Sequence, residues 1–388
     1  MKLSARGSQN PHSGIREMFD RAASLEDVVN LGVGEPDFST PRHIVDAAIE
    51  GLKKGETKYT PNAGVYSLRK AIAEKLVREN DISGTMPDNI TITSGACEAI
   101  TLALFVLSDP GDEILIADPS WPNYIGQITA SGSKAVMLPT SKKERFHIQP
   151  AVVDKTITSR TKGIILNSPS NPTGAVLSKE ELVVLAEIFK KNSIFVISDE
   201  PYEKLVYDEA RHFSIGSFPS MKDYVITINS FSKSYAMTGW RVGYICSPPH
   251  VASAIAKMQE NFSSCVNAAA QCGALEAIIG AQEPTKEMRD SYNLRRSLIV
   301  KGLNKIPGFI CPWPEGAFYV FPDISALGLN SNDFALKLLE SERVVTVPGT
   351  AFGICGEGHI RMSFAASEEN IREALKRISN FVAKLRPF

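Results

Sequence analysis

Lys233 and Arg241 follow a mostly apolar run at residues 225–228. A lysine becomes a nucleophile when partial burial or a neighbouring cation lowers its pKa and leaves a free amine. Ser230 and Ser232 carry short hydroxyl groups that can bond to phosphate oxygens, and the planar guanidinium of Arg241 suits a phosphate dianion. These residue types together indicate a site for a phosphate ester that also carries an aldehyde.

A second phosphate-binding signal is the segment "TSGACEAI", which opens a helical pattern. Gly95 lets the backbone approach a ligand closely, and the first amides of a helix are unpaired donors that can bind a phosphate. The same letters also fit an ordinary N-cap serine at Ser94 followed by a turn glycine. Because this helix start, a lysine, two serines and an arginine suit one ligand, the residues indicate pyridoxal phosphate (PLP).

Three further polar residues could face the ring of that ligand. Asp199 follows a short hydrophobic run, where burial of a carboxylate is costly unless it has a partner. It could form a structural ion pair or face a protonated ring nitrogen. Tyr202 could place a phenol beside the same ring. Asn171, in "SNPTG", could be a turn residue before proline or an amide donor to a ring oxygen.

The elements that must position these residues alternate between strands and helices from about residue 44 to 280. The strand-like runs lie at 90–93, 113–117, 134–138, 163–166, 194–197, 224–228 and 241–246. A helix at 178–191 opens with a capping box of Ser178 and Glu181. Apolar strands that alternate with helices predict an α/β fold whose mostly parallel (mixed) central sheet is sandwiched by helices. Ligands bind beyond the carboxyl ends of such strands, and polar segments follow five of the runs.

The pattern changes after about residue 281. Helical segments at 285–304, 332–341 and 368–385 mix with short strands at 317–321, 344–347 and 359–364. This mixture predicts a second, smaller α+β domain, on which we expect the first 40 residues to pack. The predicted division is a large PLP-binding domain at 43–284 and a small domain made of 1–42 and 285–388.

The composition excludes several classes of protein. The 388 residues carry a net charge of −1, without the basic excess of a nucleic-acid binder. The N-terminus is too polar for a signal peptide, and the longest apolar stretch, 99–107, is shorter than the ~18 residues of a membrane span. The six cysteines form no CxxC pair, which argues against zinc and against a disulfide framework. We therefore expect a cytoplasmic protein with no metal, no membrane and no nucleic-acid partner.

Eight motifs, in order and at compatible spacing, resemble one family. They are "GEPDF" (34–38), "YTPNAG" (59–64), "SGACEAI" (94–100), "NPTG" (171–174), "SDEPY" (198–202), "SFSKSYAMTGWRVGY" (230–244), "PEGAFYVFP" (314–322) and "RMSF" (361–364). The chain is similar nearly end to end to the aspartate aminotransferase family of fold-type I PLP enzymes, in its class I branch. The resemblance implies an amino acid:2-oxo acid aminotransferase that runs a ping-pong cycle through pyridoxamine phosphate.

The resemblance also implies a role for individual residues in binding the cofactor. Lys233 would form the Schiff base and transfer the proton, and Asp199 would keep the ring nitrogen protonated. Asn171 and Tyr202 would bond the phenolic oxygen of the ring, and Trp121 would stack on the ring face. The residues that would hold the phosphate are Gly95, Ala96, Cys97, Ser230, Ser232 and Arg241.

Other implied roles concern the substrate and the partner subunit. Arg361 would bind the α-carboxylate of the substrate in a bidentate pair, and Gly34, Trp121 and Asn171 would line the same pocket. Tyr59 would reach the phosphate of a neighbouring subunit, which implies a homodimer.

Two positions depart from the pattern of the family. Cys97 stands where one aspartate-using subgroup has a lysine that contacts the side-chain carboxylate of the substrate. A thiol cannot supply that charge, which puts a dicarboxylate preference by this route in doubt. Pro201 stands where isoleucine or valine is more usual, and it is expected to stiffen the loop that carries Tyr202.

Alternative functions on the same scaffold remain open. A PLP-dependent β-lyase or synthase would have the same sheet and cofactor site. A PLP-scaffold regulator would need a DNA-binding segment that the chain does not show, and a nicotinamide dehydrogenase would need a third glycine that "GVGEP" lacks. The amino donor stays open between alanine, aspartate, aromatic and branched amino acids, and so does the 2-oxo acid acceptor.

Overall fold

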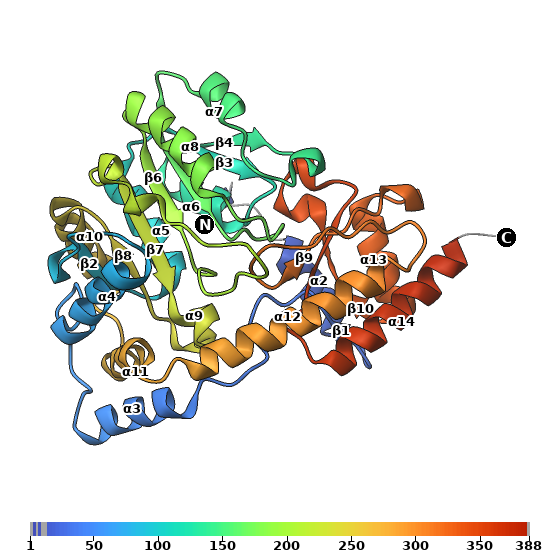
Figure 1. The fold of residues 1–388 in the computed structure, drawn as a ribbon, viewed down its shortest axis with the longest axis horizontal. Helices are drawn as coiled ribbons and strands as arrows, with labels where there is room; N and C mark the ends of the chain where they lie inside the picture. The colour runs from blue at the N-terminus through green and yellow to red at the C-terminus, as the bar shows by residue number, and fades with distance from the viewer. Residues whose placement is uncertain (1–2, 5–6, 9–13, 386–388) are drawn as a thin grey trace.

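The structure is a computed structural model that describes residues 3, 4, 7, 8 and 14–385 (Figure 1). Its largest sheet has seven strands in the order β2-β8-β7-β6-β5-β3-β4. The strands are β2 (Ile90–Thr93), β3 (Glu113–Asp118), β4 (Lys134–Pro139), β5 (Thr161–Asn167), β6 (Phe195–Asp199), β7 (Val225–Ser230) and β8 (Gly243–Cys246). Strand β8 runs antiparallel to β2 and β7, and the other neighbouring pairs are parallel. The predicted α/β class with a mostly parallel, mixed sheet is therefore confirmed.

Successive residues of the central strands pack on opposite faces of the sheet. Ile114 and Ile116 of β3 belong to a hydrophobic cluster with residues of α5, α6 and α10. Leu115, between them, belongs to a second cluster with residues of α7 and α8. Because both faces are covered, the strands read as continuous apolar runs. The helices are α5 (Gly95–Leu107), α6 (Asn123–Ser131), α7 (Pro150–Thr156), α8 (Lys179–Lys191) and α10 (Pro249–Phe262).

Another cluster closes the β2 edge of the sheet. Residues of α3 (Arg42–Lys53), α4 (Tyr66–Glu79) and α11 (Ala268–Ile279) pack there with β2 and β8. The short α9 (Phe231–Ser234) follows β7 and carries Lys233. Helix α4 therefore borders β2 and β8 at this edge of the sheet.

The remaining elements form a smaller layer of helices and short strands. They are α2 (Gly14–Ala22), β1 (Val29–Asn30), α12 (Glu283–Leu303), β9 (Tyr319–Val320), α13 (Ser331–Glu342), β10 (Val344–Val345), β11 (Val347–Pro348), β12 (Ile360–Ser363) and α14 (Glu368–Leu385). Strands β11, β12 and β9 form an antiparallel sheet, while β1 pairs in parallel with β10. The long α12 extends from beneath α9 to the side of α14 (Figure 1). The β1–β10 pairing supports the predicted domain division, whose boundaries stay a prediction.

Local backbone geometry corrects three of the expected strands. Arg241, predicted to begin a strand, has a φ of 55°, a left-handed conformation that a strand cannot contain, so β8 starts at Gly243. The strand expected at 317–321 shrinks to β9, because Ala317 has a φ of 58°. The strand expected at 344–347 splits into β10 and β11, which pair with different partners.

The capping box of α8 is confirmed. The backbone N–H of Ser178 donates to the Glu181 carboxylate at 2.8 Å, and the N–H of Glu181 donates to the Ser178 hydroxyl at 3.2 Å. Within the described residues, no helix is long and apolar enough to cross a membrane.

One edge of the sheet gathers the chemically active residues. Strands β5 and β6 end in register at Asn167 and Asp199, and the last residue of β7, Ser230, pairs with Gly243 at the start of β8. Because β8 runs antiparallel to β7, it begins at the edge of the sheet where β7 and the strands parallel to it end. This topology brings Arg241 to the same edge as Asp199.

Candidate active site

A cavity of about 400 Å³ lies at this edge of the sheet. The predicted site residues that line it are Gly34, Ala96, Cys97, Trp121, Asn171, Asp199, Tyr202, Ser230, Ser232, Lys233, Arg241 and Arg361. They come from segments spread over most of the sequence. The structure therefore brings together the strand-end residues that were expected to share one site.

Two predicted residues are not in the lining. Gly95 lies just behind it, where a side chain would collide with the guanidinium of Arg241. Tyr59 is 90% exposed on the surface of the chain and lies outside the cavity lining. Its expected contact with a neighbouring subunit stays a prediction.

Asp199 is a buried carboxylate with one oxygen to spare. The hydroxyl of Tyr124 donates to its Oδ2 at 2.5 Å, while within the described part of the chain Oδ1 is buried and has no hydrogen-bond partner. Burial raises the pKa of Asp199 to about 7, and the hydrogen bond from Tyr124 opposes that rise. The free oxygen can accept a hydrogen bond from a protonated ring nitrogen. That positive charge would favour the ionised form of Asp199.

Lys233 is held inside the same cavity. Its Nζ donates to the carbonyl oxygen of Gly34 at 2.5 Å and lies 5.8 Å from the centre of the Phe318 ring. Burial lowers the pKa of Lys233 to about 8. The free amine is therefore accessible near neutral pH, as a nucleophilic lysine requires.

The start of α5 and Arg241 form a seat for an anion. Gly95 has a φ of 78°, and a Cβ at Gly243 would lie 2.9 Å from the N atom of Ala96, so both glycines are needed for close approach. Ser94 caps α5 with no side-chain hydrogen bond, which argues against the simple N-cap interpretation and leaves the first amides free for a ligand. The guanidinium of Arg241 donates to two backbone carbonyls, those of Thr238 and Ser94.

The hydroxyls of Ser230 and Ser232 complete this seat. They lie 2.9 Å apart, and the N–H of Ser232 donates to the Ser230 hydroxyl at 3.1 Å. Cys97 lines the neighbouring wall, where burial raises the pKa of its thiol. The thiol is thus neutral and adds no charge to the seat, consistent with the departure noted from the sequence.

Arg361 is a buried cation that lacks a carboxylate partner among the described residues. Its guanidinium donates to the side-chain oxygen of Asn171 at 3.0 Å and to the carbonyl of Gly32 at 2.6 Å. The rings of Tyr319 and Phe352 lie over it at 4.5 and 4.9 Å. Burial lowers the pKa of Arg361, and in the described residues its buried Nε has no acceptor. A carboxylate ligand would supply both the acceptor and the countercharge.

Sequence reasoning assigned no site role to six residues of the lining, which are Ile15, Asn123, Tyr124, Asn167, Pro201 and Tyr319. Tyr124 follows Trp121 in "SWPNY", a segment that lies after β3, and this position was the available signal. Tyr319 lies in "PEGAFYVFP", and its hydroxyl is 2.9 Å from that of Tyr202. Tyr319 also explains why position 34 is a glycine, because a Cβ there would be 2.6 Å from the Tyr319 hydroxyl. Ile15 comes from α2, in a segment that carried no signal.

The residues present fit PLP. The unpaired oxygen of Asp199 suits a protonated pyridine nitrogen, and Lys233 offers an amine to the aldehyde. The start of α5 and Arg241 suit the phosphate. These groups share one cavity, and each would meet a different part of the same molecule.

Comparisons with known proteins agree with this geometry. The family described as aminotransferase class I and II matches residues 26–378. An aspartate aminotransferase of Pyrococcus horikoshii is 41% identical over 94% of this chain and 93% of its own length. An aromatic-amino-acid aminotransferase of Thermococcus litoralis is 38% identical over 97% of each chain.

A solved structure shows the same fold. The aspartate aminotransferase from Thermus thermophilus with maleate has a TM-score of 0.94 at 38% identity, and the match covers 98% of this chain and 99% of that one. Fold type I is thereby confirmed, as is the aminotransferase function that the resemblance implied. The chain belongs to the class I aminotransferases, within the family of class I and II aminotransferases.

Proposed function

We propose that this aminotransferase binds PLP in the cavity at the carboxyl edge of its large sheet and uses Lys233 to attach it and to move the substrate proton. The observation that carries the proposal is the unpaired buried oxygen of Asp199, which shares a cavity with the Lys233 amine. The Asp199 oxygen can accept a hydrogen bond from the ring nitrogen of PLP, and the Lys233 amine can react with its aldehyde.

The chain's own residues would divide the work of a ping-pong cycle. Bound PLP supplies an electron sink and carries the amino group between the two half-reactions. Asp199 would hold a proton on the ring nitrogen, and Tyr202 would donate to the phenolic oxygen. Lys233 would take the proton from the α-carbon of the substrate and return it. Arg361 would orient the α-carboxylate, with Asn171 holding the guanidinium in place.

We also propose a homodimer in which Tyr59 reaches the cavity of the partner. Its side chain is 90% exposed in the single chain, and the nearby Tyr66 is 62% exposed. Large aromatic groups left in solvent are typical of interface positions. The cytoplasmic location stays a prediction.

The donor amino acid can be identified by a half-reaction screen. Relatives are named for aspartate and for aromatic amino acids, so the panel should include both along with alanine and branched donors. An amino acid that converts the cofactor absorbance without releasing ammonia is a transamination donor. Release of ammonia would instead indicate the lyase alternative.

Substitution Lys233→Ala should abolish transamination while the protein still folds. Without the amine, proton transfer at the α-carbon loses its acid–base group, and we expect the rate to fall at least about a thousandfold. The measurement is the rate of 2-oxo acid formation, with Lys204→Ala as the control. Substantial activity in the Lys233 variant would contradict the assigned role.

Substitution Asp199→Asn should stabilise the apoprotein at alkaline pH. Burial raises the Asp199 pKa from 3.8 to about 7, so the folded state binds more protons than the unfolded state between those values. The contribution of this group to the free energy of unfolding therefore falls as pH rises through that window. Removing it should give an advantage that grows by about 2 kcal/mol between pH 5 and pH 8.

Urea unfolding of the cofactor-free protein at those two pH values measures this difference. The variant should also bind PLP more weakly, because a neutral amide is a poorer partner for a protonated ring nitrogen than a carboxylate. An advantage that does not change with pH would show that Asp199 is not perturbed in this way.

Substitution Arg361→Lys should weaken substrate binding. A lysine cannot reproduce the planar bidentate pair with a carboxylate, and the lost charged hydrogen bond corresponds to about 10- to 100-fold in KM. Arg372→Lys, at an exposed ion pair of α14, is the control. An unchanged KM for every substrate of the wild-type protein would exclude Arg361 as the carboxylate-binding residue.

A further inference from the structure

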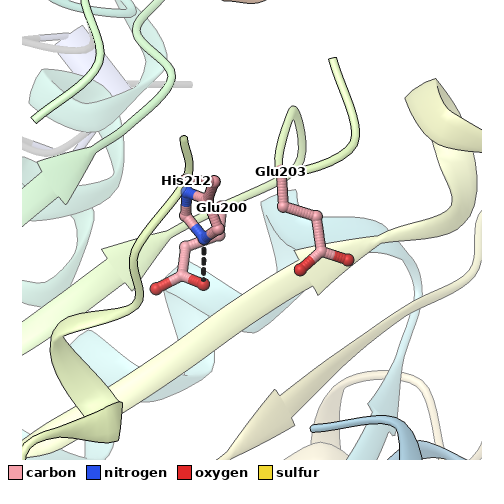
Figure 2. A group of neighbouring side chains, drawn as sticks. All are labelled: Glu200, Glu203 and His212. Carbon is pink, nitrogen blue, oxygen red and sulfur yellow. Dashed lines mark hydrogen bonds and ion pairs between the residues drawn. The ribbon is translucent and has the colours of Figure 1, made fainter. Parts of the chain in front are cut away.

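Three side chains with metal-ligating atoms cluster behind the cavity. Ligand atoms of Glu200, Glu203 and His212 lie within 4.8 Å of one another. Figure 2 shows a hydrogen bond between His212 and Glu200, with Glu203 set apart from both. Both carboxylates already have other partners, so the grouping is better explained by those partners than by a metal ion.

Glu203 is half of a buried ion pair. Its carboxylate is paired with the ammonium of Lys75 from α4, and the two side chains are 9% and 2% exposed. The side-chain amide of Asn80 bridges the pair, donating to Glu203 at 2.6 Å and accepting from Lys75 at 2.9 Å. Burial alone would raise the pKa of Glu203, but the nearby cations, Lys75 first, lower it to about 2. Glu203 is therefore ionised in the folded protein.

The position of Glu203 in the chain gives the pair its importance. Asp199, the last residue of β6, and Tyr202, in the segment that follows, both line the cavity, while the next residue after each is bound elsewhere. Glu200 accepts from the hydroxyls of Ser198 and Ser214, and Glu203 is held by α4. Asp199 and Tyr202 are thus each followed by a glutamate that is bound outside the cavity.

We propose that Lys75 and Glu203 are a positioning pair for the cofactor: the ion pair fixes the turn after β6, so that the hydroxyl of Tyr202 is held where it can donate a hydrogen bond to the phenolic oxygen of the PLP ring. This inference rests on the proposed cofactor site. The pair joins α4 to the turn across 128 positions of sequence, and the hydroxyl of Tyr202 meets that of Tyr319 on the other side. Tyr202 is therefore held at both ends: its hydroxyl contacts that of Tyr319, and its backbone is fixed by the ion pair of Glu203, the next residue.

A buried ion pair can be replaced by apolar residues without leaving an unpaired charge. The double variant Lys75→Met/Glu203→Leu removes the anchor in this way and keeps the net charge of the protein. A matched control exists in the same two segments, since Lys204, next in the turn, pairs with Glu79 of α4 at a more exposed position. The Lys204 and Glu79 side chains are 25% and 28% exposed, and ion pairs nearer the solvent contribute less, so Lys204→Met/Glu79→Leu should disturb the turn less.

The test uses the intact protein and two readouts other than turnover. The first is the dissociation constant of PLP, from titration of the cofactor-free protein. The second is the pH midpoint at which the absorbance band of bound PLP changes, which responds to hydrogen bonding at the ring oxygen. A donor to that oxygen stabilises its anion, so displacement of Tyr202 should raise the midpoint by about half a pH unit or more. We expect PLP to bind about tenfold more weakly in the double variant.

The outcomes separate this inference from the proposed function. If the wild-type protein binds no PLP, both fail. If the wild-type protein binds PLP, and the Lys75→Met/Glu203→Leu variant keeps the same dissociation constant and midpoint, the positioning role alone is overturned. An equal change in dissociation constant and midpoint in the control double variant would also overturn the positioning role. Loss of any ion pair between α4 and the turn would then explain the effect.

A second variant covers a failure of the double variant to fold. Glu203→Gln keeps the size of the side chain and the hydrogen bond from Asn80, but it leaves Lys75 buried without its counterion. We expect weaker PLP binding here too, and Glu203→Asp, which keeps the charge, should recover part of it. PLP affinity in Glu203→Gln equal to that of the wild-type protein would contradict the proposal.

Discussion

The cavity holds buried charges that do not neutralise one another. Arg361 is a cation and burial shifts the pKa values of Lys233 and Asp199 toward neutrality, yet no ion pair joins the three within the described residues. Charged groups without partners are unfavourable in a protein interior, so they are maintained only where the surrounding structure is stable enough to hold them. A ligand that supplies a hydrogen-bond partner or a countercharge to these groups therefore binds with a favourable interaction that the protein alone does not make. Preorganised charge of this kind is the main source of catalysis in many enzymes.

The rest of the fold provides the stability that this arrangement requires. The large sheet is buried on both faces, with separate apolar clusters above and below strands such as β3. Its parallel strands end at one edge, and the single reversed neighbour β8 brings Arg241 to that edge. Glycines at 95 and 243 let the start of α5 and Arg241 come together there. The charged residues therefore sit at the ends of rigid elements rather than on long loops.

Much of this could be predicted from the sequence because strand and helix periodicity is local. The strand at 90–93 and the helix at 368–385 agree with the structure residue for residue, and the strand-end rule placed Asp199 and Lys233 in one region. Residue roles such as that of Arg361 came from the resemblance to a family, since nothing local distinguishes a buried arginine from an exposed one. Arg241 shows the limit of periodicity, because the local pattern does not reveal its left-handed backbone or the position of its guanidinium beside Gly95.

What escaped prediction depends on contacts between distant parts of the chain. The bond from Tyr124 to Asp199 spans 75 positions, and the Lys75–Glu203 pair spans 128. No pattern in either segment points to the other. Ile15 reaches the cavity from α2, and this helix is placed by its contacts with β10 and β11 in the smaller layer. The chemistry could thus be inferred from residue types, whereas the supporting contacts required the structure.

The central claim is that the amine of Lys233 is the group that attaches PLP. The most direct measurement is to mix the cofactor-free protein with PLP, reduce it with borohydride, digest it and find the labelled peptide by mass spectrometry. The account predicts a single label, on Lys233. A label on another lysine, or none at all, would contradict it.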